Sequence, residues 1–189
     1  MVKLDKIYTK GGDKGFTSLG DGERVKKHSL RVSTYGEIDE ANALIGISII
    51  YSTKKTSERL KIIQNDLFDI GGDLCIPDLS KKKKLRVSEE QIQYLEREID
   101  EMNKCLEALS SFVLPGGTKG SAYLHLARCV VRRSERSLSL LANKESISEI
   151  IFKYINRLSD FLFVASRYEN REYGDVLWEP GKYQKGKKK

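Results

Sequence analysis

The chain has 189 residues and a formal net charge of +7, from 34 basic and 27 acidic residues. A single domain of this length buries roughly 70% of its unfolded surface, so its core needs neither disulfides nor a structural metal. Nine lysines lie in two runs, within 81–84 and 182–189, which leaves the other charges nearly balanced. The positive charge therefore does not by itself indicate nucleic-acid binding.

The cysteines and the hydropathy indicate a soluble protein of a reducing compartment. Cys75, Cys105 and Cys129 are far apart, and the sequence shows no CxxC pair, zinc spacing or secretory start. The best apolar run, residues 43–51, is far shorter than the roughly 20 residues of a membrane span. We therefore expect a cytoplasmic protein without a membrane partner.

The N-terminal segment is rich in glycine and in groups that can bind phosphate. Five glycines lie between residues 11 and 22, although GxxxxGK[ST] and GxGxxG are both missing. Glycine lets backbone N–H groups approach an anion, and lysine and hydroxyl groups complete a phosphate-binding loop. From these residues alone, a phosphate-binding loop and a flexible arm remain equally open. The surrounding donors are Thr9, Lys10, Lys14, Thr17, Ser18, Arg24, Lys26 and Lys27.

The next segments show apolar residues at helical spacing. A first helix is predicted over 35–51 and a second over 57–74, which Pro77 follows. Ser88 and Gln91 form a capping box that begins a third helix. The sequence shows no convincing strand.

Two further helices complete the predicted fold. The fourth covers residues 118–141, and the fifth begins at another capping box, formed by Ser146 and Glu149. Because short turns join the helices, the sequence predicts an all-α, antiparallel five-helix bundle behind a glycine-rich N-terminal loop.

The fourth predicted helix carries three arginines and a glutamate on one face. Arg128, Arg132, Glu135 and Arg136 lie at offsets of zero, four, seven and eight, which share one side of a 3.6-residue helix. The planar fork of arginine suits phosphate oxygens, and Glu135 can hold a guanidinium or a ribose hydroxyl. Together with the glycine-rich loop, this arginine stripe predicts a polyphosphate site.

Other candidate residues have two interpretations each. Asp39 and Asn42 share a face of the first helix, and Asn156 and Asp160 are one turn apart on the fifth. Each pair belongs either to a binding site or to an ordinary polar face or inter-helix contact. Phe112, in the connector before the fourth helix, either packs on that helix or faces a ligand.

The histidines exclude two kinds of catalysis. His28 and His125 are the only ones, and neither follows a glutamate at the spacing of a di-iron bundle. No local signature indicates a nucleophile with a histidine base, and His125 is expected to be a surface or packed residue. We assign no metal-binding side chain.

Six segments, in the same order along the chain, resemble the PduO-type ATP:cob(I)alamin family of corrinoid adenosyltransferases. They cover roughly residues 3–170 and read KIYTKGGDKGFTSL, YGEIDEANALIG, LFDIGGDL, FVLPGG, ARCVVRRSER and INRLSD. The resemblance implies a homotrimer of five-helix bundles that transfers the 5′-deoxyadenosyl group of ATP to the cobalt of cob(I)alamin. Triphosphate and adenosylcobalamin would be the products.

The resemblance also implies roles for matching residues. Asp39, Arg128 and Arg132 would be catalytic, with Asp39 meeting Arg128 of a neighbouring subunit. Phe112 would pack against the lower face of the corrin, and Mg²⁺ would accompany ATP. The implied ATP-binding residues are Thr9, Lys10, Gly11, Gly12, Thr17, Ser18, Lys27, Arg132, Arg133, Ser134, Glu135, Arg136 and Asn156.

The expected organisation is one domain over residues 1–189, with a nucleotide-binding loop at 1–30 and a flexible basic tail at 172–189. Trp178 and Tyr183 are candidates for a second corrin contact. A reductase that supplies cob(I)alamin and enzymes that use adenosylcobalamin are the implied partners. The alternative, based on the lysine runs, is a nucleotide-sensing or RNA-binding bundle without catalysis.

Overall fold

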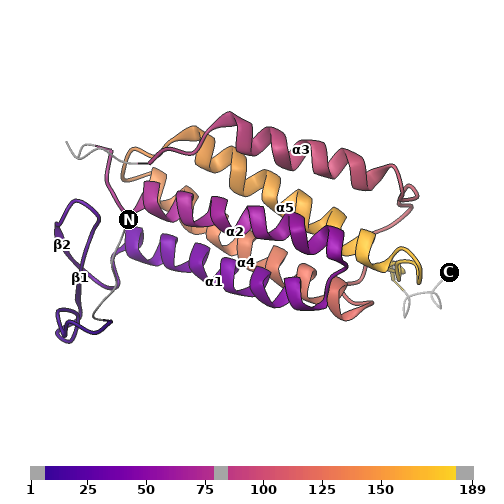
Figure 1. The fold of residues 1–189 in the computed structure, drawn as a ribbon, viewed down its shortest axis with the longest axis horizontal. Helices are drawn as coiled ribbons and strands as arrows, with labels where there is room; N and C mark the ends of the chain where they lie inside the picture. Colours follow the sequence, from indigo (N-terminus) through magenta and orange to yellow (C-terminus); the bar gives the residue numbers. More distant parts are fainter. Residues whose placement is uncertain (1–6, 79–84, 182–189) are drawn as a thin grey trace, which may run out of the picture.

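A computed structural model describes residues 7–78 and 85–181, in which five helices form a bundle with a hairpin at one end (Figure 1). Successive helices run antiparallel, so the predicted fold class is confirmed. None of the described helices is both long and apolar enough to cross a membrane. The helices are α1 (Leu30–Tyr51), α2 (Lys54–Leu74), α3 (Glu89–Asn103), α4 (Lys119–Ala142) and α5 (Glu149–Asn170).

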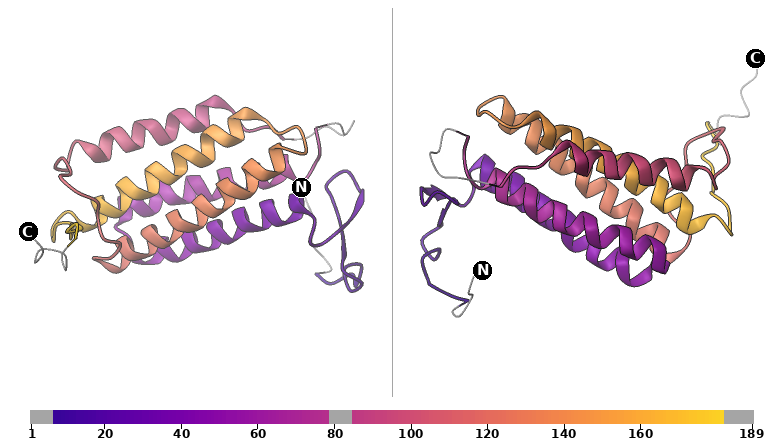
Figure 2. Two further views of the ribbon diagram at one scale, coloured as in Figure 1. Left: turned by 180° about the vertical axis from the view of Figure 1, so that it is seen from behind. Right: turned by 45° about the horizontal axis from the view of Figure 1, so that its top comes forward.

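The bundle is held together by the apolar stripe of each helix. α1 packs against α2 and α4, and α5 packs against α4 and α3 (Figure 2). Large side chains from different helices, including Ile45, Leu67, Leu124 and Phe161, are fully buried between them. Burial of these stripes is the main stabilising term, and it leaves one side of α4 facing outward.

Helix α1 begins at Leu30 and not at residue 35 as predicted. The reason is a buried polar first turn that interrupts the apolar pattern. Arg31, which is 5% exposed, donates hydrogen bonds to Glu145 and to the carbonyl oxygen of Leu74. Thr34 is also buried, and its hydroxyl donates to the carbonyl oxygen of Leu30. Because these buried residues are polar, the hydropathy pattern of the first turn resembles that of a loop, and the predicted helix begins too late.

One predicted capping box is confirmed and the other is wrong. The backbone N–H of Ser88 donates to Oε1 of Gln91 over 2.9 Å, as expected for a capping box. The fifth helix instead has Ser148 as its N-cap, without a side-chain cap bond. The Ser146 hydroxyl donates to Asp78 at 3.1 Å, so a contact with the loop after α2 replaces the predicted cap.

The prediction that the chain contains no strand is wrong for the N-terminal loop. β1 (Phe16–Ser18) pairs antiparallel with β2 (Arg24–Lys26), and Gly22 in the turn has φ of +100°. Strands of three residues in a glycine-rich segment are too short to show the alternation of apolar and polar residues that indicates a strand. The N–H of Gly20 donates to the carbonyl oxygen of Cys75 at 2.8 Å, which attaches the hairpin to the end of α2.

The opposite end of the bundle carries the connector before α4 and the segment after α5 (Figure 1). Val113 and Leu177 form an antiparallel bridge, and the N–H of Trp178 donates to the carbonyl oxygen of Phe112 at 2.7 Å. The first part of the expected flexible tail is thus paired with the connector up to Trp178. The lysine runs and Tyr183 lie outside the described residues.

Gly117, at the end of this connector, is expected to tolerate no side chain. Its φ is +90°, and a Cβ there would lie 2.2 Å from Oδ1 of Asn170, which accepts a hydrogen bond from the N–H of Thr118. We expect Gly117→Ala to lower the free energy of unfolding by about 2 kcal/mol, measured by urea denaturation. Gly116→Ala is the matched control, because a Cβ there meets no atom within 4 Å. Equal losses in both variants would contradict the steric explanation.

Candidate active site

The arginine stripe of α4 faces outward, as its spacing predicts. Arg132 and Arg136 are exposed, and Nη1 of Arg136 donates to the carbonyl oxygen of Arg132 at 2.9 Å. In the described part of the chain, neither guanidinium forms an ion pair. Two neighbouring cations without an acidic partner are available to an anionic ligand.

The polar side chains of α4 and α5 meet beside this stripe. Nδ2 of Asn156 donates to Oε1 of Glu135 at 2.9 Å. The carboxylate of Glu135 keeps acceptor capacity for a ribose hydroxyl or a guanidinium. The structure thus brings together Glu135 and Asn156, which the resemblance placed at the same nucleotide.

Two other polar candidates have ordinary structural roles. Asn42 is buried between α1 and α2, and its Nδ2 donates to the carbonyl oxygen of Gln64 at 3.2 Å. Asp160 accepts a hydrogen bond from Nη1 of Arg157 at 2.7 Å on the exposed side of α5. The interpretation as inter-helix and surface contacts therefore holds for Asn42 and Asp160.

The resemblance implies that residues 132–136 all contact ATP, and the structure places the side chains of Arg133 and Ser134 differently from the others. Ser134 is 1% exposed, and its hydroxyl donates to the carbonyl oxygen of Val130 at 3.2 Å. Arg133 forms an ion pair with Glu40 of α1. Consecutive helical residues point in different directions, so the five side chains do not share one face, and those of Arg133 and Ser134 stay predictions as ATP contacts. The outward stripe comprises Arg132, Glu135 and Arg136.

The glycine-rich loop folds into a compact turn around its basic residues. Nη2 of Arg24 donates to the carbonyl oxygen of Gly11 at 2.7 Å, and Nη1 donates to the hydroxyl of Ser18 at 3.2 Å. A Cβ added to Gly12 would lie 2.9 Å from Nζ of Lys27. The lysine ammonium group therefore lies directly against the backbone of this glycine.

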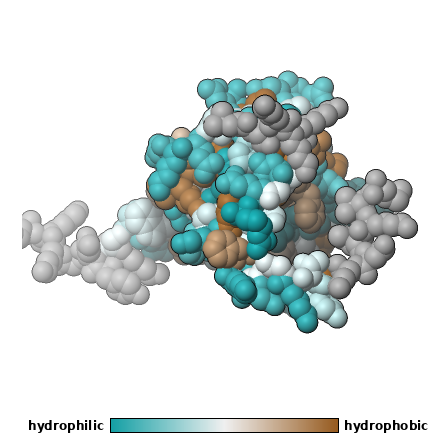
Figure 3. All heavy atoms as spheres, turned by 90° about the vertical axis from the view of Figure 1, so that its left-hand side faces the viewer, coloured by the Kyte–Doolittle hydropathy of each residue, from teal (hydrophilic) through white to brown (hydrophobic). Residues whose placement is uncertain are grey.

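The start of the loop is exposed. Thr9 and Lys10 are exposed, Lys10 has φ of +58°, and Thr17 lies in β1 opposite Val25. Ile7 is 85% exposed. Figure 3, which views the molecule from the hairpin end, shows apolar side chains exposed among hydrophilic ones. This end presents apolar surface that the single chain does not cover.

The loop and the arginine stripe form no hydrogen bond or ion pair with each other among the described residues. The hairpin is attached to the end of α2 instead. The hairpin and the connector before α4, which contains Phe112, lie at opposite ends of the bundle (Figure 1). Since α1 has 22 residues and runs the length of the bundle, the distance between these two ends is about 33 Å.

Phe112 lies at the mouth of an aromatic cavity and does not pack onto the next helix. It is 77% exposed, and its ring centroid lies 6.0 Å from that of Trp178. The cavity of about 650 Å³ is also bordered by Arg128 and Phe163. The sequence interpretation missed Phe163, an apolar residue of α5 beside its inner face. Trp178 was a candidate without a local pattern.

Arg128 connects the stripe to this cavity. Its guanidinium carbon lies 5.9 Å from the ring centroid of Phe163, and its Nε is buried without a hydrogen-bond partner among the described residues. Its proposed partner Asp39 is exposed on α1 and has no described partner either. Burial, followed by the charge of Arg128, lowers the pKa of the neighbouring His125, which is a packed residue as expected.

The basic glycine loop, the outward arginine stripe and the aromatic cavity of this bundle offer surfaces that suit a polyphosphate and a large apolar group. Comparison with known families identifies the class of enzyme. The family model for cobalamin adenosyltransferase matches residues 7–169. The chain belongs to the cobalamin adenosyltransferase family.

Individual relatives match over most of the chain. It is 48% identical over 186 residues to the corrinoid adenosyltransferase of Mycobacterium tuberculosis H37Rv, covering 95% of this chain and 96% of the relative. Identity to the Bacillus subtilis corrinoid adenosyltransferase is 42%, with 92% of each protein covered. A variant PduO-type ATP:corrinoid adenosyltransferase from Lactobacillus reuteri, solved with cobalamin and ATP, has a TM-score of 0.88 and 38% identity. That match covers 92% of this chain and 99% of the other.

Proposed function

We propose that the chain transfers the 5′-deoxyadenosyl group of ATP to the cobalt of cob(I)alamin, releasing triphosphate and forming adenosylcobalamin. Membership of the family supports this reaction, and so does a structure of a relative bound to cobalamin and ATP. The observation in this chain that carries the proposal is the pair of exposed arginines, Arg132 and Arg136, which form no ion pair among the described residues and lie one and two turns from the cavity-lining Arg128.

The reaction requires charge stabilisation and positioning rather than a protein nucleophile. Cobalt(I) attacks the ribose C5′ carbon, and the bond between C5′ and the triphosphate oxygen breaks. Negative charge then develops on the leaving triphosphate. Lys10 and Lys27 from the loop and Arg132 and Arg136 from α4 share this charge. Glu135, hydrogen-bonded to Asn156, holds the ribose.

Phe112 acts on the corrinoid and not on ATP, by controlling which groups reach the cobalt. A ligand below the corrin donates electrons to the metal and makes cobalt(II) harder to reduce. An exposed aromatic side chain at the cavity excludes water and the axial base, which favours the four-coordinate form that is easier to reduce. The position of Phe112 beside Trp178, at the mouth of a cavity of about 650 Å³, supports this role.

We propose that the active site is shared between neighbouring subunits of a homotrimer. The loop of one chain lies about 33 Å from its own aromatic cavity, an estimate from the length of α1, and in this proposal the loop and the cavity that serve one pair of substrates come from different subunits. The buried Nε of Arg128 and the exposed Asp39 each have no described partner within one chain. An ion pair between Asp39 of one subunit and Arg128 of the next would satisfy both.

Further components follow from the chemistry of the substrates. We propose that Mg²⁺ enters with ATP, because it commonly binds phosphate oxygens and retains several waters. No side chain is assigned to it, and the described residues contain no group of three metal-binding side chains. Three free cysteines support a cytoplasmic location, where a reductase supplies cob(I)alamin and dependent enzymes receive the product.

The direct test is to mix the purified protein with ATP and chemically reduced cobalamin under strict exclusion of oxygen. We expect a light-sensitive adenosyl product and one triphosphate for each product molecule. Cobalamin left unreduced is the control and should give no product. Absence of product with cob(I)alamin and Mg²⁺ present would contradict the proposed function.

A further inference from the structure

We propose that Arg167 is a positioning residue for the corrinoid. It fastens the connector and the segment after α5 to the bundle, so that Phe112 and Trp178 together form one aromatic edge of the cavity. This inference rests on the proposed function, because it assigns the cavity to the corrinoid. The side chain of Arg167 does not line that cavity, and it acts through the two aromatic residues.

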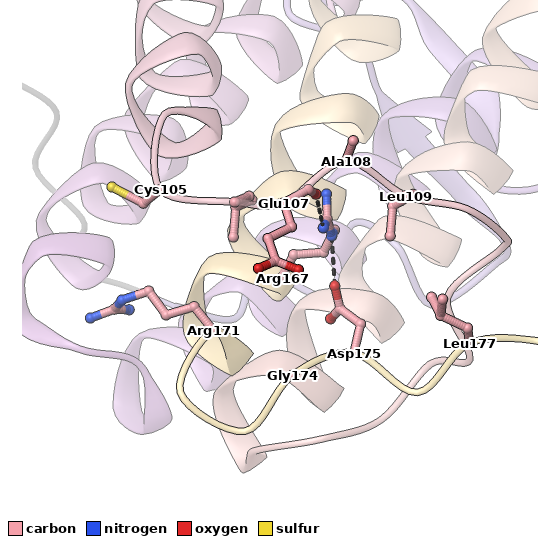
Figure 4. A pocket seen from close by; sticks show the side chains of 10 residues that line it. Cys105, Glu107, Ala108, Leu109, Arg167, Arg171, Gly174, Asp175 and Leu177 are labelled. Atoms are coloured by element: carbon pink, nitrogen blue, oxygen red, sulfur yellow. Dashed lines mark hydrogen bonds and ion pairs between the residues drawn. The ribbon is translucent and has the colours of Figure 1, made fainter.

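Arg167 is a buried cation that joins three parts of the chain. Its side chain is 10% exposed on α5. Nε donates to Oδ2 of Asp175 in the following segment at 2.7 Å, and Nη2 donates to the carbonyl oxygen of Glu107 in the connector at 2.7 Å. Figure 4 shows the guanidinium between these two partners, beside a smaller cavity of about 280 Å³. One planar fork therefore fixes both segments relative to α5.

The two segments then pair with each other further along. Ser111 donates to the carbonyl oxygen of Trp178 at 2.7 Å, and the N–H of Trp178 donates to the carbonyl oxygen of Phe112 at 2.7 Å. Asn170 adds a link near the start of the segment, because its Nδ2 donates to the carbonyl oxygen of Gly174 at 2.6 Å. The positions of both aromatic rings thus depend on how these segments are held.

The aromatic rings themselves contribute little to this attachment. Phe112 is 77% exposed and Trp178 is 44% exposed, so burial in the core does not hold either ring. A few backbone bonds in an exposed two-segment pairing open easily. A hydrogen-bonded guanidinium with a carboxylate, largely shielded from water, is stronger and more directional than such bonds. Lysine could not replace it, because an ammonium group lacks the planar fork.

Trp178 is the only tryptophan in the chain, so its fluorescence reports on the segment directly. In Asp175→Asn and in Arg167→Lys we expect a red-shifted and more readily quenched emission, because the released segment exposes the indole to water. Far-ultraviolet circular dichroism should keep the helical signal of the wild type. An emission unchanged in both variants would overturn the proposal, whether or not the protein adenosylates cobalamin.

The kinetic readout separates positioning from a general loss of stability. We expect Asp175→Asn to raise KM for the corrinoid about tenfold, while KM for ATP changes by less than about twofold, because only the aromatic edge moves. Glu98→Gln is the matched control. It removes the charge of Glu98 on α3, which pairs with Arg59, another buried arginine, on α2. The control should lower stability without changing either KM.

Equal increases in KM for both substrates in Asp175→Asn would show a merely structural role and overturn the proposal. A corrinoid-specific increase in Glu98→Gln would do the same. If the wild type formed no adenosyl product at all, the proposed function would fail. The fluorescence comparison would still decide whether Arg167 holds the segment.

Discussion

Replacing Arg132 by alanine is expected to lower kcat by about 100-fold or more, the size of effect seen when one donor to a developing oxyanion is lost. Arg132 is exposed on α4 and forms no ion pair among the described residues, so its guanidinium is free to contact the leaving triphosphate. Charge grows on that group only as the C5′ bond breaks. The loss should therefore be larger in kcat than in the affinity for ATP.

Two further variants make the Arg132 result specific. Arg132→Lys keeps the charge but loses the planar fork, so we expect an intermediate rate. Arg157→Ala is the control, because Arg157 pairs with Glu96 and Asp160 on the surface, and such pairs contribute little to stability. The rate of each variant and of the wild type is measured as triphosphate released in reactions that are stopped at fixed times. A wild-type rate in Arg132→Ala would show that the stripe does not bind the leaving group.

Replacing Phe112 by alanine is expected to slow the reaction that starts from cobalt(II) at least about tenfold more than the reaction supplied with prereduced cobalt(I). The aromatic ring lies at the cavity mouth beside Trp178 and is 77% exposed in the absence of the corrinoid. Without it, water or the axial base reaches the metal and hinders reduction. Chemically supplied cobalt(I) bypasses that step.

The Phe112 experiment is read from the ratio of the two rates and from the electronic spectrum of bound cobalt(II). The four-coordinate signature should weaken in Phe112→Ala. Leu114→Ala is the matched control, since Leu114 is a partly exposed apolar residue of the same connector that does not line the cavity. Equal slowing of both reactions by Phe112→Ala would remove the proposed role of the ring.

Much of the fold follows from local pattern. The apolar periodicity of α2 to α5 predicts their existence, and the Ser88 and Gln91 capping box predicts the start of α3. The sequence fails where tertiary contacts override local signals. Arg31 is buried because Glu145 and the end of α2 provide its partners, and the short hairpin forms against Cys75. None of these partners is adjacent in sequence.

The candidate site divides in the same way. Helical spacing alone places Arg132, Glu135 and Arg136 on one face, and the structure adds the bond from Asn156 to Glu135. The family resemblance indicated that the ligand is ATP, which helical periodicity could not show. It also included Ser134, whose burial only the packed structure reveals. The meeting of Phe112 with Trp178 depends on a pairing between segments far apart in the chain, which no local pattern indicates.

In the proposed trimer, one subunit supplies the loop of each active site and its neighbour supplies the arginine stripe. Two inactive variants, Lys27→Ala in the loop and Arg132→Ala in the stripe, test it when they are co-expressed in equal amounts and purified as mixed oligomers. In a cyclic trimer with random mixing, about one quarter of the interfaces combine an intact loop with an intact stripe. We therefore expect the mixture to recover about one quarter of the wild-type adenosylation rate. If each site lies within one chain, the mixed oligomers would be no more active than the two variants alone, and that result would contradict the shared site.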